Sequence, residues 1–265
     1  MATHYPAETL SIEGADAVAF AHAQFSSEVT ALAVGQWQFS AWLNPQGRVR
    51  ALFHLARIAD DQLLLLLRGG NANEMADALR RFVFRSKLTL RAMEPRALST
   101  GPALPAQVVL HDEETLTFGC DTHSLIVGAA HDDRWRLMQL RAGWPWLPDQ
   151  VLNELLPPAL SLLRLQAIAL NKGCYPGQEI VARLHYRGGN KRHLHCVVLS
   201  QAAIAGTTLR TDERDIARLL DVVEVDKTFE ALAIIADESL DIMTGKNLQI
   251  SDDGMHMQLR SSWPA

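Results

Sequence analysis

The stretch Lys172-Gly-Cys-Tyr-Pro-Gly-Gln-Glu179 is the most informative segment of this 265-residue chain. Its two glycines and one proline predict a tight, irregular turn. The apolar spacing that follows predicts a helix that begins near Gly177. Cys174 would then lie just before a helix N-terminus and two residues from Lys172, and both neighbours favour the thiolate over the thiol. The residues alone allow two interpretations, a reactive cysteine or a small buried residue in a turn.

The first hundred residues have the pattern of a small antiparallel α+β unit. A strong turn signal, Asn44-Pro-Gln-Gly47, separates two strand-like runs and predicts a hairpin. Met75, Leu79 and Phe82 recur at helical spacing, which predicts that they share the buried face of a helix. We expect strands over 35–43, 48–58, 62–68 and 87–93, and helices over 14–25 and 71–84. This β-β-β-α-β order predicts an α+β fold rather than a doubly wound parallel sheet.

Beyond residue 95 the pattern changes twice. Residues 95–105 contain three prolines and a glycine, which predict a connection. Short strands are expected near 107–110, 124–127 and 135–140. After Asn190, short apolar runs alternate with turn-like or acidic segments, as in a small antiparallel barrel or sandwich. We therefore divide the chain into a body, 1–190, with an internal break near 95–105, and a C-terminal β-barrel, 191–265.

Composition places the chain among globular proteins, with 48% apolar residues and a net charge of −5. The charge is uneven, because residues 172–195 carry +4 and residues 212–241 carry −7. The basic stretch would attract an anionic ligand or form an ordinary solvated face. No apolar run approaches the roughly 20 residues of a membrane span, and the N-terminus does not resemble a secretory signal. With three widely spaced cysteines, we expect a cytoplasmic protein without membrane contact.

The octapeptide 172–179 is similar to the signature K-G-C-Y-x-G-Q-E of the YgfZ family, which is related to the glycine-cleavage T-protein, an aminomethyltransferase. Every specified position of that signature matches. The similarity covers most of residues 10–195, whereas residues 196–265 match only in their alternation of short apolar runs with turn-like or acidic segments. Further matching segments are Val181-Ala-Arg183, Tyr186-Arg-Gly188, Lys191-Arg192, Leu43-Asn-Pro-Gln-Gly-Arg48 and Arg141-Ala-Gly143.

This resemblance implies the T-protein fold, in which two interleaved α+β units and a C-terminal β-barrel form a ring around a folate-sized hole. It implies a folate-binding accessory protein that supports iron–sulfur enzymes and tRNA modification through the reactive cysteine Cys174. The implied cofactors are tetrahydrofolate or a folate derivative, together with a transient iron–sulfur cluster. The implied partners are iron–sulfur enzymes such as tRNA-thiolating proteins.

The resemblance also implies roles for individual residues. Lys172 would activate Cys174, which would act by redox chemistry, by cluster contact or by covalent transfer. Trp135 is suited to stacking on the flat pterin and equally suited to a place in the core. Arg187 belongs to a basic set that would hold the glutamate tail of a folate or face solvent. That set is Arg183, Arg187, Lys191 and Arg192. The folate-binding residues would be Trp135, Tyr175, Gln178, Glu179 and Arg187.

One departure from the T-protein pattern bears on activity. The T-protein strand after the first hairpin carries acidic residues that meet the folate, whereas residues 48–54 of this chain contain no carboxylate. A general acid directed at the pterin is therefore missing there, which argues against aminomethyl transfer. A folate-dependent one-carbon (aminomethyl) transferase is kept as the alternative enzyme.

A direct RNA-binding module is the alternative from another class. The basic stretch 172–195 carries Tyr175 and Tyr186 for stacking on bases. The chain is acidic overall and has no RNA-module signature, so we expect no direct nucleic-acid contact. The pairs Cys120-Asp-Thr-His123 and His193-Leu-His195 match no standard ligand spacing, so no structural metal site is expected.

Overall fold

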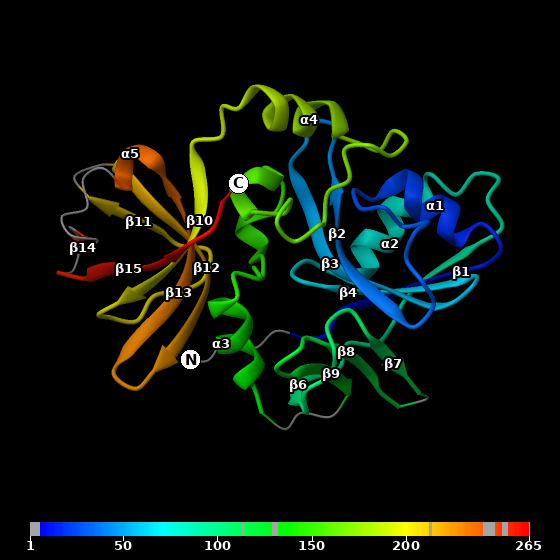
Figure 1. Cartoon of the computed structure of the whole chain (residues 1–265), viewed down its shortest axis with the longest axis horizontal. Coiled ribbons are helices and arrows are strands. Elements are labelled where there is room, and N and C mark those ends of the chain that lie inside the picture. Colours follow the sequence, from blue (N-terminus) through cyan, green and yellow to red (C-terminus); the bar gives the residue numbers. More distant parts are fainter. Residues whose placement is uncertain are drawn as a thin grey trace.

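The computed structural model describes residues 6–112, 114–128, 132–211, 214–240, 247–250 and 254–264. Their fold is mixed α/β and rich in strands, with three antiparallel sheets and few helices (Figure 1). The first and third sheets lie at opposite ends of Figure 1, and helix α3 with the segment after it lies between them. Within the described ranges, no helix is both long and apolar enough to span a bilayer.

The first sheet has the strand order β2-β3-β4-β1-β5. Its strands are β1 (Thr9–Glu13), β2 (Gln36–Leu43), β3 (Val49–Ala59), β4 (Gln62–Leu67) and β5 (Thr89–Ala92). Helices α1 (Ala17–Gln24) and α2 (Ala72–Arg80) pack on one face of it, over a core that includes Phe20, Phe53 and Leu79. The Asn71 side chain accepts hydrogen bonds from the first backbone amides of α2 and fixes its start. The predicted hairpin and both predicted helices are confirmed, and β1 is a strand that the sequence pattern did not reveal.

The second sheet is small and has the order β6-β9-β8-β7. Its strands are β6 (Ala97–Gly101), β7 (Val109–His111), β8 (Leu116–Gly119) and β9 (Ser124–Gly128). The predicted strands near 107–110 and 124–127 are confirmed as β7 and β9. The prediction that 95–105 is only a connection was wrong, because Ala97–Gly101 pairs along its whole length with Ser124–Gly128.

The third sheet is curved, with the order β11-β12-β13-β10-β15-β14. Its strands are β10 (Arg192–Leu199), β11 (Thr208–Thr211), β12 (Arg214–Val225), β13 (Thr228–Ala236), β14 (Asn247–Gln249) and β15 (His256–Ser262), with a short helix α5 (Asp237–Leu240) after β13. Its two edge strands approach each other, since the Thr211 hydroxyl donates a hydrogen bond to the Gln249 carbonyl at 3.2 Å. Its core includes Val197, Leu219 and Ile235.

Helix α3 (Arg134–Arg141) occupies the place where a strand was predicted over 135–140. A short apolar run does not distinguish a strand from a buried helix by periodicity alone. The helix is stabilised by a contact with a residue far away in the sequence. The Arg136 guanidinium is buried and lies 2.7 Å from the Asp221 carboxylate of β12. Only a helix over this segment brings the buried Trp135, Arg136, Gln139 and Leu140 to one contact surface.

The end of α2 corrects a second expectation. Met75 and Leu79 are buried as predicted, but the helix stops at Arg80, and Phe82 lies beyond it with half of its surface exposed. The chain turns there instead of continuing, since the Phe82 amide donates to the Leu79 carbonyl at 2.9 Å and the Val83 amide to that of Arg80 at 3.2 Å. These are three-residue spacings of a tightening last turn, so Phe82 leaves the buried face.

The fully buried Arg68 connects the first sheet to α3 and to the segment after it through hydrogen bonds. Arg68, directly after β4, donates to the Pro145 carbonyl, to the Trp144 carbonyl and to the Gln139 side chain, each at 2.8 Å. It also contacts the ring of His54 on β3 at 3.2 Å. Burial, followed by the Arg68 charge, holds the pKa of His54 well below its usual range, so this imidazole is neutral.

Candidate functional site

Residues 172–177 form a partly exposed loop that leads into helix α4 (Gln178–Arg187), as predicted. Gly177 is the residue before the helix and has φ = 78°, a conformation that favours glycine. Figure 1 places α4 along the top of the molecule, between the first sheet and β10 of the third. Cys174 therefore lies on the loop that enters α4, and this loop is packed against residues from the first part of the chain.

Lys172 ties this loop to the first part of the chain. Its ammonium donates to the Phe25 carbonyl at 2.8 Å and to the Ser27 carbonyl at 2.7 Å, and lies 5.2 Å from the centre of the Tyr175 ring. Burial lowers the pKa of Lys172 to about 8. Its observed contacts are those of an anchor, and the activation of Cys174 by this ammonium stays a prediction.

The other side of the loop rests on the hairpin turn of the first sheet. A side chain at Gly177 would place its Cβ 2.6 Å from the Asn44 carbonyl oxygen and 2.7 Å from the Gly47 Cα, closer than real contacts allow. Tyr175 is buried in the core, and the Gln178 side chain donates to the Lys172 carbonyl at 3.3 Å. The close approach of Gly177 to Asn44 and Gly47 brings together two of the segments that carried the family resemblance, although they are about 130 residues apart.

The three cysteines differ sharply in their surroundings. Cys120 and Cys196 are buried, whereas Cys174 is exposed, and all three are free. Burial raises the pKa of Cys120 to about 12 and that of Cys196 to about 11, so both stay protonated thiols near neutral pH. Cys174 is thus the thiol that an external molecule reaches.

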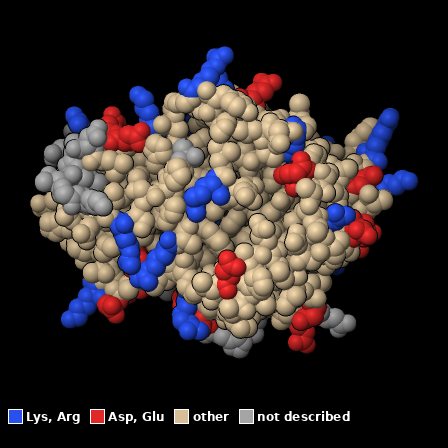
Figure 2. All heavy atoms as spheres, in the orientation of Figure 1, with Lys and Arg blue, Asp and Glu red and all other residues tan. Residues whose placement is uncertain are grey.

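The remaining predicted site residues are dispersed. Glu179 and Arg187 are exposed on α4, and because the helix rises about 1.5 Å per residue they lie roughly 12 Å apart. Trp135 lies in the core at the start of α3, with its ring centre 5.2 Å from that of Trp146. Around α4, Figure 2 shows cations beside an acid rather than a continuous basic surface. Their roles in folate binding stay predictions.

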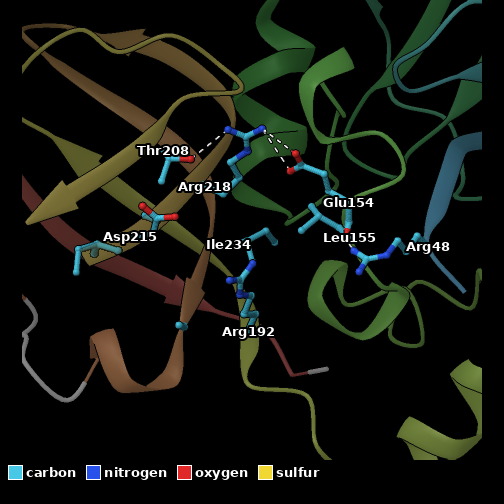
Figure 3. Close-up of a pocket in the computed structure, with 11 residues that line it drawn as sticks. Arg48, Glu154, Leu155, Arg192, Thr208, Asp215, Arg218 and Ile234 are labelled. Atoms are coloured by element: carbon cyan, nitrogen blue, oxygen red, sulfur yellow. Dashed lines mark hydrogen bonds and ion pairs between the residues drawn. The ribbon is translucent and has the colours of Figure 1, made fainter. Parts of the chain in front are cut away.

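A cavity of about 330 Å³ lies between the first and third sheets (Figure 3). Arg192, a member of the predicted basic set, lines it together with Arg48 and Arg218. Neither Arg48 nor Arg218 was predicted as a site residue. Arg48 was noted only as the last residue of the matching segment Leu43-Asn-Pro-Gln-Gly-Arg48, and Arg218 carries no motif signal. Among the described residues, no group of three or more His, Cys, Asp or Glu side chains is arranged to hold a metal ion.

Comparison with known proteins identifies relatives along most of the chain, although no family model matches it. An uncharacterised protein of Haemophilus influenzae is 31% identical over 191 residues, which span 70% of this chain and 68% of that protein. The tRNA-modifying protein YgfZ of Sodalis glossinidius is 25% identical over 236 residues, 73% of this chain and 72% of that protein. That of Aliivibrio fischeri is 27% identical over 215 residues, with coverages of 70% and 67%. The chain belongs to the YgfZ family.

The fold of this YgfZ-family chain is also that of a solved enzyme. The glycine cleavage system aminomethyltransferase T of Bartonella henselae superposes with a TM-score of 0.73 at 16% sequence identity, covering 96% of this chain and 82% of that one. This similarity confirms the T-protein-like fold.

The anchor of the YgfZ-type loop gives a testable result. Replacing Lys172 with methionine retains the apolar stem but removes both hydrogen bonds to carbonyls, so we expect the free energy of unfolding to fall by about 1–3 kcal/mol. Chemical denaturation of the variant beside the wild type measures this change. Lys191→Met, which removes an exposed lysine just beyond α4, is the control and should leave stability nearly unchanged. Equal stability of the two variants would mean that Lys172 does not anchor the loop.

Proposed function

We propose that this chain is a folate-binding accessory protein that supports tRNA modification by iron–sulfur enzymes through the thiol of Cys174. One observation carries the proposal: the exposed Cys174 lies on a loop that is fixed at Lys172, Tyr175 and Gly177, while the other two cysteines are buried. A loop with this many long-range contacts presents its thiol in one defined place, which suits a reaction with a partner macromolecule.

The chemistry available to a single exposed thiol is limited and specific. A thiolate attacks disulfides and other electrophiles, and it ligates iron in iron–sulfur clusters. Cys174 supplies one such ligand, so in this proposal the client enzyme supplies the remaining ligands of any shared cluster.

A reduced folate is the second component of the proposal. The T-protein-like fold supports it, and the folate would occupy a hole enclosed by two interleaved α+β units and the third sheet. Trp135 would stack on the pterin, Tyr175, Gln178 and Glu179 would line the approach to Cys174, and Arg187 would face the glutamate tail. Strand β3 carries no carboxylate between Val49 and Ala59, which favours folate binding without aminomethyl transfer. Calorimetric titration with tetrahydrofolate tests this part, with Trp135→Phe expected to weaken binding.

The thiol proposal is tested in cells that lack the gene. We expect the wild type to restore thiolated tRNA nucleosides, measured by mass spectrometry of tRNA hydrolysates, and Cys174→Ser to restore almost none. Cys120→Ala is the matched control, because it removes a buried thiol and should complement. The purified Cys174→Ser protein should keep its thermal stability, since the side chain is exposed. Full complementation by Cys174→Ser would disprove the proposal, and a collapse of its stability would favour the structural interpretation of the cysteine.

A further inference from the structure

The cavity between the first and third sheets brings together charged residues from three parts of the chain (Figure 3). Arg48 follows the hairpin turn of the first sheet, Arg192 begins β10, and Arg218 lies on β12. Two acids, Glu154 and Asp215, also line this space of about 330 Å³. Whether the cavity favours an anion depends on which of these charges are already neutralised.

Both acids have arginine partners. The Glu154 carboxylate lies 3.3 Å from the Arg218 guanidinium, and the Asp215 carboxylate accepts from Arg210 at 2.7 Å. Arg218 also donates to the Thr208 hydroxyl at 3.1 Å, and Figure 3 shows its guanidinium turned toward both partners. Glu154 and Asp215 therefore leave the other cations of the cavity uncompensated.

Two of the arginines, Arg48 and Arg192, are not paired with a carboxylate. Arg48 donates to the main-chain carbonyl of Glu154, an acceptor without formal charge. The guanidinium of Arg192 has neither a hydrogen bond nor an ion pair with any residue in the described part of the chain. Both side chains line the cavity, so it presents two unneutralised positive charges.

The rest of the lining is apolar and well fixed. Leu155, Ile216 and Ile234 are buried beneath the arginines. The backbone next to Arg48 is held in place, because the Val49 amide donates to the Leu155 carbonyl at 2.9 Å. The arginines therefore lie above buried apolar side chains, and the surface that the cavity offers to a ligand is mainly polar.

We propose that this cavity is a binding site for a small organic dianion, either a phosphate monoester or a dicarboxylate. Its charged group would pair with Arg48 and Arg192, since a guanidinium binds both kinds of anion through two parallel hydrogen bonds. Arg192 belongs to the basic set considered for a folate tail, but the site includes neither Cys174 nor any of the five residues assigned to folate, so it goes beyond the function proposed above.

The experiment is a calorimetric titration of the full chain with AMP and, separately, with glutarate. We expect at least one of them to bind with a dissociation constant below about 1 mM. Arg192→Gln should weaken that binding about tenfold or more while leaving thermal stability nearly unchanged, because this guanidinium is exposed and has no hydrogen bond or ion pair with the residues that the structure describes. Lys227→Gln removes the same charge from an exposed turn of the same sheet and should bind like the wild type. Binding should also weaken as ionic strength rises.

The outcomes separate the ligand classes. Preference for AMP identifies a phosphate site, and preference for glutarate identifies a carboxylate site; both support the proposal if Arg192→Gln weakens them selectively. Adenosine, which lacks the phosphate, should bind far more weakly than AMP. Failure of the wild type to bind either dianion would overturn the proposal. Equal weakening by Arg192→Gln and Lys227→Gln would do the same, because it would show a diffuse charge effect rather than a site.

Discussion

Replacing Arg68 with methionine is expected to lower the free energy of unfolding by about 3 kcal/mol or more. The guanidinium is fully buried, and its removal would leave the carbonyls of Trp144 and Pro145 and the Gln139 side chain without their donor. Each buried acceptor that loses its partner costs roughly 1–3 kcal/mol. Methionine retains the apolar stem but not the volume of the guanidinium, so the loss would combine the broken polar network with a small cavity.

Arg50→Met is the matched control for that experiment. Arg50 also lies on the first sheet and stacks over a tryptophan, with its guanidinium 3.8 Å from the centre of the Trp42 ring, but it is partly exposed. We expect a cost below about 1 kcal/mol, as is usual for an exposed cation–π contact. Urea denaturation of both variants makes the comparison. If they unfolded at the same urea concentration, the network around Arg68 would contribute nothing beyond a surface contact.

The second large effect is expected from acid. Burial, together with the charge of His193, lowers the pKa of His195 to about 4, whereas the unfolded residue titrates near 6.5. The unfolded chain therefore binds more protons than the folded one below pH 6.5, so stability is lost as the pH falls through that value toward 4. From pH 7.5 to 5.0 this residue alone should remove about 2 kcal/mol from the free energy of unfolding. The neutral, buried His54 adds to the loss in the same direction.

Urea denaturation at several pH values tests this prediction. His195→Gln should flatten the dependence on pH between about 6.5 and 5, whatever it does to stability at neutral pH. His256→Gln, which replaces an exposed histidine of β15 in the same sheet, should keep the wild-type slope. An unchanged slope in His195→Gln would show that this imidazole has the same pKa in the folded and unfolded chains, which would contradict the prediction.

Local signals explain which parts of the fold were predictable. The turn at 44–47 and the strand-like runs on either side of it depend on residues close in sequence, and both appear in the structure. The segment 135–140 was misjudged because its helical state depends on Asp221, 85 residues away, as the partner of Arg136. Phe82 was misjudged because helical spacing continues in the sequence after the helix itself has ended at Arg80.

In the candidate site, too, the features set by nearby residues were predictable and those set by distant residues were not. The position of Cys174 before a helix followed from glycine, proline and apolar spacing within a dozen residues. The role of Lys172 as an anchor did not, because its acceptors are carbonyls at positions 25 and 27. The dianion cavity also could not be predicted from the sequence, because Arg48, Arg192 and Arg218 come together only when the first and third sheets have packed in the folded chain. Backbone acceptors and convergent surface cations leave no pattern in a single sequence.

The bond from Lys172 to Phe25 spans 147 residues, and this span determines when the thiol reaches its final surroundings. Contacts of such long sequence separation form late, because closing a large loop costs entropy before the contact compensates for it. On the ribosome, residues 25–27 emerge long before Cys174 is made, and the loop closes onto them only afterwards. An excised peptide with the sequence 172–187 would hold the same atoms without that closure. Selective presentation of Cys174 is thus a property of the completed chain, and a newly made or partly unfolded molecule carries an ordinary, unplaced thiol.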